Sequence, residues 1–131
     1  MAMFHFDLVS PEQLVFSGEV EHVVLPGTEG EFGVLAGHAP LVAMLRPGIL
    51  KILGPTEQRI FVTGGFAEVT PEALTVLVDR AVPVEEVDSM AIAGEIEGAE
   101  QKLADAKDDA ARDKLHTRIE QLRAVQAELG R

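Results

Sequence analysis

The sequence predicts an α+β fold, in which an N-terminal antiparallel β-sandwich is followed by a C-terminal antiparallel two-helix hairpin. Up to Pro83, short runs with an apolar period near two recur between turn-forming residues; beyond it, apolar residues recur at steps of three and four. All six phenylalanines and all seven prolines also lie at or before Pro83, whereas the rest of the chain is rich in alanine and charge. We therefore expect two domains, residues 1–84 and residues 85–131.

At least seven short strands are expected in the first domain. Runs of alternating apolar residues are separated by turn-forming pairs such as Ser10-Pro11, Ser17-Gly18 and Thr70-Pro71. Strands at this spacing are typical of a sandwich of two packed sheets. The clearest runs are residues 4–9, 20–25, 49–53, 59–63, 67–70 and 74–78.

Two one-sided helices are expected in the second domain. Asp88 and Ser89 are candidate N-caps for the first helix, and the Asp108-Asp109 pair is a suitable connection to the second. The apolar stripes contain no aromatic residue, so the hairpin alone buries little area and is a candidate moving part. The stripe positions are Ile92, Ile96, Ala99, Leu103 and Ala106 in one helix and Leu115, Ile119, Leu122, Val125 and Leu129 in the other.

The segment from Leu25 to Leu41 has an unusual composition, with four glycines, two prolines and one histidine among single apolar residues. Glycine adopts backbone angles that other residues avoid, and Pro26 and Pro40 fix φ at the two ends. The pattern predicts a shaped loop that offers a surface to a partner. Because Glu29 and Glu31 lie within it, a partner with a basic loop would be attracted and oriented.

Composition excludes several classes of site. The chain has no cysteine, which rules out disulfides, thiolate zinc sites and cysteine nucleophiles. Its formal net charge of -11 argues against nucleic acid as a partner. The histidines lack metal-site spacing, no Walker-type nucleotide loop follows the glycines, and no serine lies in a nucleophile elbow. We expect no catalytic, metal-binding or cofactor-binding residues, and therefore no enzyme.

Hydropathy predicts no insertion into a membrane. No apolar run approaches the roughly 20 residues needed to cross a bilayer, and the N-terminus lacks the pattern of a signal peptide. We expect a soluble cytoplasmic chain that would reach a membrane only through other proteins.

Several motifs in the same order resemble the epsilon subunit of bacterial F-type ATP synthases over essentially the whole chain. The resemblance is carried by the opening Phe6–Glu12, by Leu25–Leu41, by the Arg46-Pro47-Gly48 turn, by Gly64–Val69 and by Thr75–Ala81. It implies a β-sandwich followed by a helical hairpin, in agreement with the periodicities. It also implies a non-catalytic rotor subunit of the central stalk, peripheral on the cytoplasmic side of the bacterial inner membrane.

The resemblance also implies partners and contact residues. The sandwich of the family binds the gamma subunit and rests on the polar loops of the c-ring, so that proton-driven rotation of the ring reaches gamma. Carried over by position, the c-ring contact comprises Glu31, Phe32 and Gly33, and the gamma contact comprises Ser10, His38, Ala39 and Pro40. The alternative for Phe32 is a place in the core.

The hairpin departs from one family pattern. In some members it extends toward the alpha and beta subunits and blocks ATP hydrolysis, and it folds back when ATP binds. ATP-binding members carry Ile/Leu-Asp-x-x-Arg-Ala at the helix start, where this chain reads Val87-Asp88-Ser89-Met90-Ala91-Ile92. The missing guanidinium removes strong hydrogen bonds to phosphate, so no cofactor is expected from this motif.

Two other functions stay open at this point. The chain could be a nucleotide-responsive binding module, which predicts ATP binding at the start of the first helix. It could also be an adaptor that dimerises through its helices, which predicts a stable homodimer without affinity for gamma.

Overall fold

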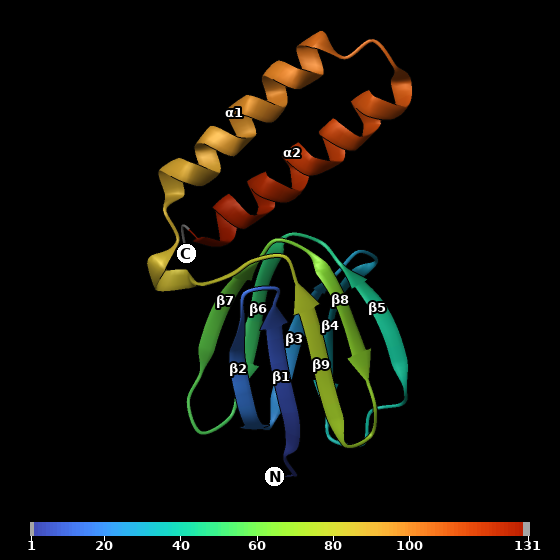
Figure 1. The fold of residues 1–131 in the computed structure, drawn as a ribbon, viewed down its shortest axis with the longest axis vertical. Coiled ribbons are helices and arrows are strands. Elements are labelled where there is room, and N and C mark those ends of the chain that lie inside the picture. Colours follow the sequence, from blue (N-terminus) through green and yellow to red (C-terminus); the bar gives the residue numbers. More distant parts are fainter. Residues whose placement is uncertain (1, 130–131) are drawn as a thin grey trace. The chain divides into compact units, whose positions relative to one another are not determined.

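The computed structural model describes residues 2–129; Met1, Gly130 and Arg131, the outermost residues of the two expected domains, lie outside the described part. The chain divides into two compact units, residues 1–85 and residues 86–131. The described residues of the first unit form β-strands, and those of the second form a pair of α-helices (Figure 1).

The strands are short and closely spaced along the chain, and two longer helices follow them. The strands are β1 (Phe4–Ser10), β2 (Gln13–Val20), β3 (His22–Gly27), β4 (Gly30–Leu35), β5 (Leu41–Leu45), β6 (Gly48–Leu53), β7 (Gln58–Val62), β8 (Gly65–Val69), β9 (Ala73–Val78) and β10 (Ala81–Pro83). A 3₁₀ turn, η1 (Val84–Glu86), precedes the helices α1 (Ser89–Asp105) and α2 (Asp109–Leu129).

The strands form a sandwich of two layers, as the sequence predicts (Figure 1). One layer has the order β10-β7-β6-β3, with β4 on the other side of β3, and the second has the order β5-β8-β9-β1-β2. The layers join at one corner, where Gly27 of β3 pairs with Leu45 of β5. The pairs are antiparallel except for β1 and β9, which run parallel from His5↔Ala73 to Val9↔Leu77.

Inward-facing residues of the two layers form an apolar core between them, and the alternation is clearest in β1. In β1, Phe4, Phe6 and Leu8 are buried, whereas His5 and Asp7 face outward. Each fully buried large apolar side chain contributes about 1.5–3 kcal/mol relative to an exposed one. The buried cluster comprises Phe4, Phe6, Leu8, Val20, Val23, Leu25, Val34, Leu45, Leu50, Ile52, Ile60, Val62, Ala67, Val69, Leu74, Val76 and Val78.

Two expectations about turns were wrong. Ser17-Gly18 is not a turn, because both residues lie inside β2 and pair with Asp7 and Phe6 of β1. The segment from Leu25 to Leu41 is not one long loop either: it contains the end of β3, all of β4 and the start of β5. Cross-strand pairing with β3 holds β4, in the middle of this segment, in an extended conformation.

The helical unit agrees closely with the sequence pattern. Asp88 is the N-cap of α1, and its carboxylate accepts a hydrogen bond of 2.9 Å from the Met90 amide. The Asp108 carboxylate accepts one of 2.8 Å from Ala110 at the start of α2. The helices pack against each other, and their buried residues, Ile92, Ile96 and Ala99 in α1 and Ile119, Leu122 and Val125 in α2, all belong to the predicted stripes.

Candidate functional site

Strand β4 carries the three residues predicted to contact the c-ring. Glu31 and Gly33 are exposed, whereas Phe32 is half-buried and packs against the core cluster. Alternation along the strand explains the difference, because neighbouring side chains of a strand point to opposite faces. A Cβ on Gly33 would meet the end of the His22 side chain of the neighbouring strand, which would have to move aside.

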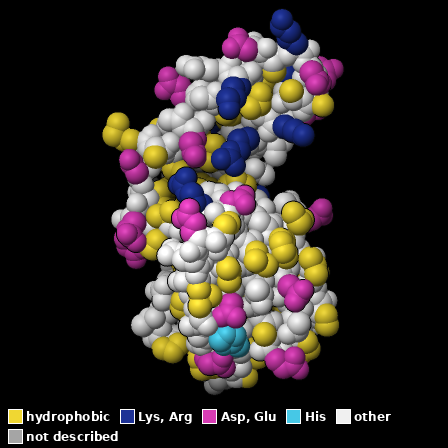
Figure 2. All heavy atoms as spheres, viewed as in Figure 1, with side chains coloured by type: hydrophobic (Ala, Val, Ile, Leu, Met, Phe, Trp, Pro, Cys, Tyr) yellow, Lys and Arg dark blue, Asp and Glu magenta, His cyan; other side chains and the backbone are white. Residues whose placement is uncertain are grey.

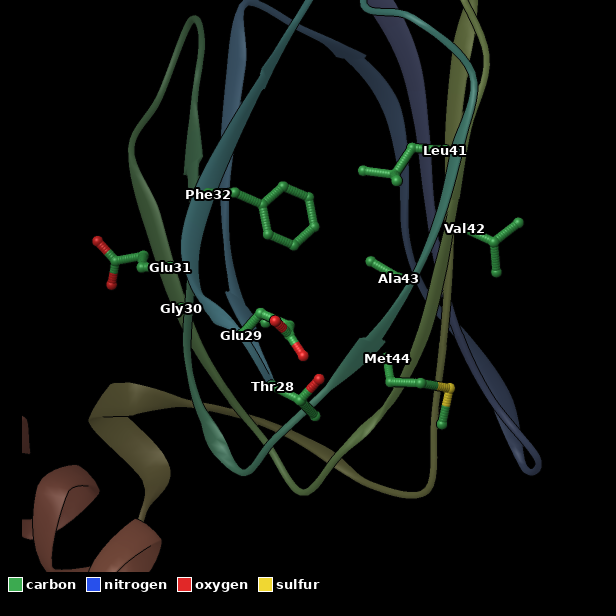
Figure 3. A pocket seen from close by; sticks show the side chains of 10 residues that line it. Thr28, Glu29, Gly30, Glu31, Phe32, Leu41, Val42, Ala43 and Met44 are labelled. Atoms are coloured by element: carbon green, nitrogen blue, oxygen red, sulfur yellow. The ribbon is translucent and has the colours of Figure 1, made fainter.

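A cleft of about 440 Å³ lies between β4 and β5, at the open side of the sandwich. Figure 3 shows Phe32 pointing from β4 into this cleft toward Leu41 and Ala43 of β5, while Glu31 points away from it. Phe32 therefore packs against the core and is also accessible from the cleft, while its contact with the c-ring stays a prediction. The cleft is lined by Gly27, Thr28, Glu29, Gly30, Glu31, Phe32, Leu41, Val42, Ala43 and Met44.

The β4–β5 connection holds three of the residues predicted to contact gamma. The Gly37 amide donates a 3.0 Å hydrogen bond to the Pro71 carbonyl in the β8–β9 turn, and the His38 amide donates one of 3.2 Å to Leu35. His38 Nδ1 lies 2.7 Å from the Ala39 carbonyl oxygen, to which it donates when this nitrogen carries the proton. The imidazole thus stabilises its own connection, and the exposed Ala39 and Pro40 are left facing solvent.

Ser10, the fourth of these residues, lies far along the same layer. It ends β1, and its hydroxyl donates a 3.4 Å hydrogen bond to the Gln13 carbonyl. Through its neighbour Val9, it lies beside the Leu77 end of β9. The β4–β5 connection instead leads into β5 at Leu41, which pairs with the opposite end of β8. The structure therefore places Ser10 and His38 near diagonal corners of the β5-β8-β9-β1-β2 layer and does not bring them together.

An apolar row crosses the outer face of this layer along its Ser10 end, opposite to the end at which β5 begins after the His38–Pro40 connection. Its members pair directly with one another across the five strands, in the order Met44↔Phe66↔Leu77↔Val9↔Leu14. Met44 and Leu14 are each 60% exposed, and Phe66 and Leu77 about 40%. Figure 2 views this layer and shows hydrophobic side chains spread across it. Such a row on a chain with so many acids is typical of a protein interface.

A polar cluster flanks the row on β1 and β2. His5 Nε2 lies 2.9 Å from Asp7 Oδ1, His5 Nδ1 lies 3.1 Å from Glu19 Oε2, and the Ser17 hydroxyl donates a 2.6 Å hydrogen bond to Asp7. The hydrogen bonds to Glu19 and then to Asp7 raise the pKa of His5, and the Ser17 hydroxyl, followed by His5, lowers the pKa of Asp7. These contacts hold the side chains of the cluster in one arrangement beside the row.

Sequence reasoning missed both the row and the cluster. The outward positions were visible as every second residue of β1, but the row depends on which residues face each other on five strands. Two of those strands, β2 and β5, were not among the predicted runs. The unbroken apolar run of residues 41–45 could have marked β5 as a strand, whereas an irregularity in the pairing of β1 with β2 interrupts the alternation in β2.

The described part of the chain offers little for other chemistry. Within residues 2–129, no group of three or more histidine, aspartate or glutamate side chains has the arrangement needed to hold a metal ion. None of the helices there combines the length and apolar character needed to cross a membrane. Ala91, at the start of α1, is exposed, and Arg123 on α2 pairs with Glu100 of α1 at 3.4 Å.

Comparison with known proteins gives consistent matches. Residues 3–84 match the sequence profile described as the ATP synthase, Delta/Epsilon chain, beta-sandwich domain. The chain is 52% identical over 130 residues to the ATP synthase epsilon chain of Nitrobacter winogradskyi, covering 98% of this chain and 96% of the relative. It is 52% identical over 120 residues to the one of Parvibaculum lavamentivorans, covering 90% and 89%.

Solved structures agree. A chain of the mitochondrial ATP synthase of Euglena gracilis, in a structure of OSCP, F1 and c-ring, matches with a TM-score of 0.82 and 29% identity, over 98% of this chain and 82% of that one. A chain of the central stalk and c-ring structure from Tetrahymena thermophila matches with a TM-score of 0.57 and 17% identity, over 63% and 68%. The second likeness concerns the fold alone.

Proposed function

The chain belongs to the family of ATP synthase delta/epsilon chains, and we propose that it is the non-catalytic rotor subunit through which rotation of the c-ring reaches the gamma subunit. As a central-stalk subunit, it has to bind the c-ring and gamma firmly enough that they rotate together. A two-layer sandwich with a continuous buried core suits that task, because close-packed interiors deform little under load.

The observation that carries this proposal is the apolar row on the outer face of the β5-β8-β9-β1-β2 layer. We assign gamma to this face, because the row lies beside Ser10 and reaches β5, the strand that follows the His38–Pro40 connection. A partner lying on this face from Ser10 to β5 would cover the row. Burying exposed apolar area there supplies about 25 cal/mol per Å² removed from water.

The c-ring contact is assigned to β4, through Glu31 and Gly33 on its exposed face. Together with Glu29 in the preceding turn, Glu31 gives this edge negative charge, which suits a partner loop that carries basic residues. Phe32 contributes from inside the cleft, where its ring supports the strand that carries the other two.

The hairpin is the proposed regulatory part, reaching the alpha and beta subunits when extended. Its buried residues are medium-sized aliphatics and one alanine, so the hairpin is held together by little apolar area. A nucleotide-responsive hairpin is the second candidate function, and the exposed Ala91 in the place of an arginine weighs against it. We place the working subunit on the cytoplasmic side of the bacterial inner membrane, as a peripheral part of the complex.

Co-expression with the gamma subunit of the same source tests the proposal. A one-to-one complex is expected by size exclusion and mass determination, and it should be lost in a Phe66→Asp, Leu77→Asp double variant. Leu35→Asp is the matched control, since Leu35 is exposed to a similar degree but lies on β4, outside the row. A His38→Ala variant should weaken the complex less than the double variant.

Two results would count against the proposal. One is a double variant that stays folded by circular dichroism and still binds gamma as tightly as the parent chain. The other is a parent chain that runs alone or as a homodimer beside abundant gamma, which would favour the adaptor function.

A further inference from the structure

We infer that the cleft between β4 and β5 binds an extended, basic segment of another polypeptide, which adds to the free edge of β4 as a further strand. The inference adds detail to the proposed contact with the c-ring. It rests on the proposed function only in that both involve Glu31 and Phe32. The partner is defined by chemistry: a short run in which basic and apolar side chains alternate.

The first argument is the free backbone on both sides of the cleft. Within residues 2–129, β4 pairs with β3 alone, along its full length from Gly30 to Leu35. Strand β5 pairs with β8, and its other edge is used only near Leu45, where it meets Gly27, and where the Thr28 amide donates to Met44. An edge strand with unpaired amides and carbonyls is a template for a further strand.

The second argument is the apolar lining at that edge. Phe32 and the 41%-exposed Leu41 face each other across the cleft, with Ala43 beside them. These side chains would lie inside a closed sandwich but remain accessible here, because β4 and β5 do not pair with each other. An added strand would cover them with its inward side chains, whereas a helix, about 10–12 Å across, would leave the edge amides of β4 unpaired.

The carboxylates beside the cleft determine which side chains the bound segment should present on its outward face. Strand β4 alternates, with Phe32 and Val34 inward and Glu31, Gly33 and Leu35 outward. A residue opposite Phe32 should therefore be apolar, and its neighbour opposite Glu31 should be basic, since opposite charges on facing strands attract. Glu29 adds a second carboxylate at the same end of the cleft. Among the described residues, those that line the cleft include no lysine or arginine. The cleft thus favours alternating apolar and basic residues.

The test uses the full isotope-labelled chain and a six-residue peptide of alternating lysine and valine, matched to the six residues of β4. We expect amide chemical-shift changes confined to β4 and β5, and slowed hydrogen exchange at β4. A peptide of alternating glutamate and valine should bind at least several-fold more weakly. A peptide with proline in place of valine should also bind weakly, because proline cannot donate to a ladder.

A reversal of the charge at position 31 tests directly whether this charge determines which peptide is preferred. Glu31→Lys should reverse the preference, so that the glutamate–valine peptide binds better than the lysine–valine peptide. Glu57→Lys, with the same change in charge on the exposed β6–β7 connection, should leave the preference as it was. Phe32→Leu should weaken both peptides without a change of preference.

Several outcomes overturn the inference. These are shifts scattered over other strands, equal binding of the proline-containing peptide, an unchanged preference in Glu31→Lys, or the absence of shifts up to about 1 mM peptide, near the weak end of useful affinity. None of them bears on gamma binding through the apolar row, so the failure of this inference and the failure of the proposed function are separate results.

Discussion

Gly65 is the position where a single methyl group should do most damage to the sandwich. It begins β8 between two partners, Leu45 of β5 and Val78 of β9, and its φ is +152°. A Cβ built on it would collide with the Leu77 carbonyl oxygen and lie 2.8 Å from Val78 Cα, and both obstacles are backbone atoms that cannot rotate away. Gly65→Ala therefore combines strain with overpacking.

The size of the effect follows from those two contributions. A non-glycine residue in a sparsely populated backbone region costs about 1–3 kcal/mol, and forcing an extra group into packed surroundings costs about 1–3 kcal/mol more. We expect Gly65→Ala to lower the free energy of unfolding of the sandwich by about 2–6 kcal/mol. The chain has neither tryptophan nor tyrosine, so urea unfolding should be followed by circular dichroism and by amide signals of the sandwich.

Gly94→Ala is the matched control, because the same methyl group meets open space there. Gly94 is exposed on α1, and apart from the adjoining backbone of the helix itself no described atom lies within 4 Å of the added Cβ. Alanine in a helix interior is about 1 kcal/mol more favourable than glycine, so this change should stabilise the helical unit. The reasoning is refuted if Gly65→Ala unfolds at the same urea concentration as the parent chain.

Three further predictions concern stability. Leu8 is fully buried, so Leu8→Ala should cost about 2–5 kcal/mol, whereas Leu14→Ala on the exposed row should change unfolding by less than about 0.5 kcal/mol; equal urea midpoints would contradict this. Asp88→Ala removes the N-cap of α1 and should cost about 1 kcal/mol, read from the thermal loss of helical dichroism, while an unchanged transition would show that the cap is dispensable. The pKa of His5 is raised from 6.5, so the contribution of His5 to stability is complete below pH 6.5 and is lost as the pH rises through the folded-state pKa. The pKa of Asp7 is lowered from 3.8, so the contribution of Asp7 is present above pH 3.8 and is lost as the pH falls through the folded-state pKa. The urea concentration at the midpoint of unfolding should therefore include a contribution from the cluster that is largest between pH 3.8 and pH 6.5. In His5→Gln, this midpoint should depend less on pH. Identical pH profiles of the parent chain and the variant would rule the cluster out as the source of the pH dependence.

The architecture was largely predictable because local signals agreed with tertiary packing. Alternation in residues 4–9 and 74–78 marked two strands that are buried on one face only, and that is the case in which period two is visible. Asp88 was readable as a helix cap because capping depends on residues one or two positions away, whereas Asp108 was predicted only as part of the connection before the second helix.

What was missed depends on pairing between distant residues. Ser17-Gly18 has the composition of a turn, yet it is straightened by its partners on β1. Residues 27–37 have the glycine-rich composition of a loop, yet Gly33 lies inside β4, where it pairs with Val24 of β3 and the end of the His22 side chain lies close to where a Cβ would be. Glycine signals a special local environment without telling whether that environment is a turn or a close approach in a sheet.

The candidate site shows the same division. Glu31 and Phe32 were selected as neighbours in sequence, but only the structure shows that they face opposite ways, one outward and one into the cleft. The apolar row is invisible in one dimension, because no two of its five members lie closer in the chain than Val9 and Leu14.

The parallel pairing of β1 with β9 constrains the order in which the chain can fold. The first strand ends at Ser10 and its partner begins at Ala73, so the centre of one layer cannot form until more than half of the chain is available. Until then β1 can only hold β2, and an isolated two-stranded hairpin is at best marginally stable in water. Contacts between such distant residues slow folding and leave apolar strands exposed meanwhile. On the ribosome, the sandwich should therefore stay incomplete until β9 has emerged, and a nascent chain that stops near residue 70 should still be open to proteases.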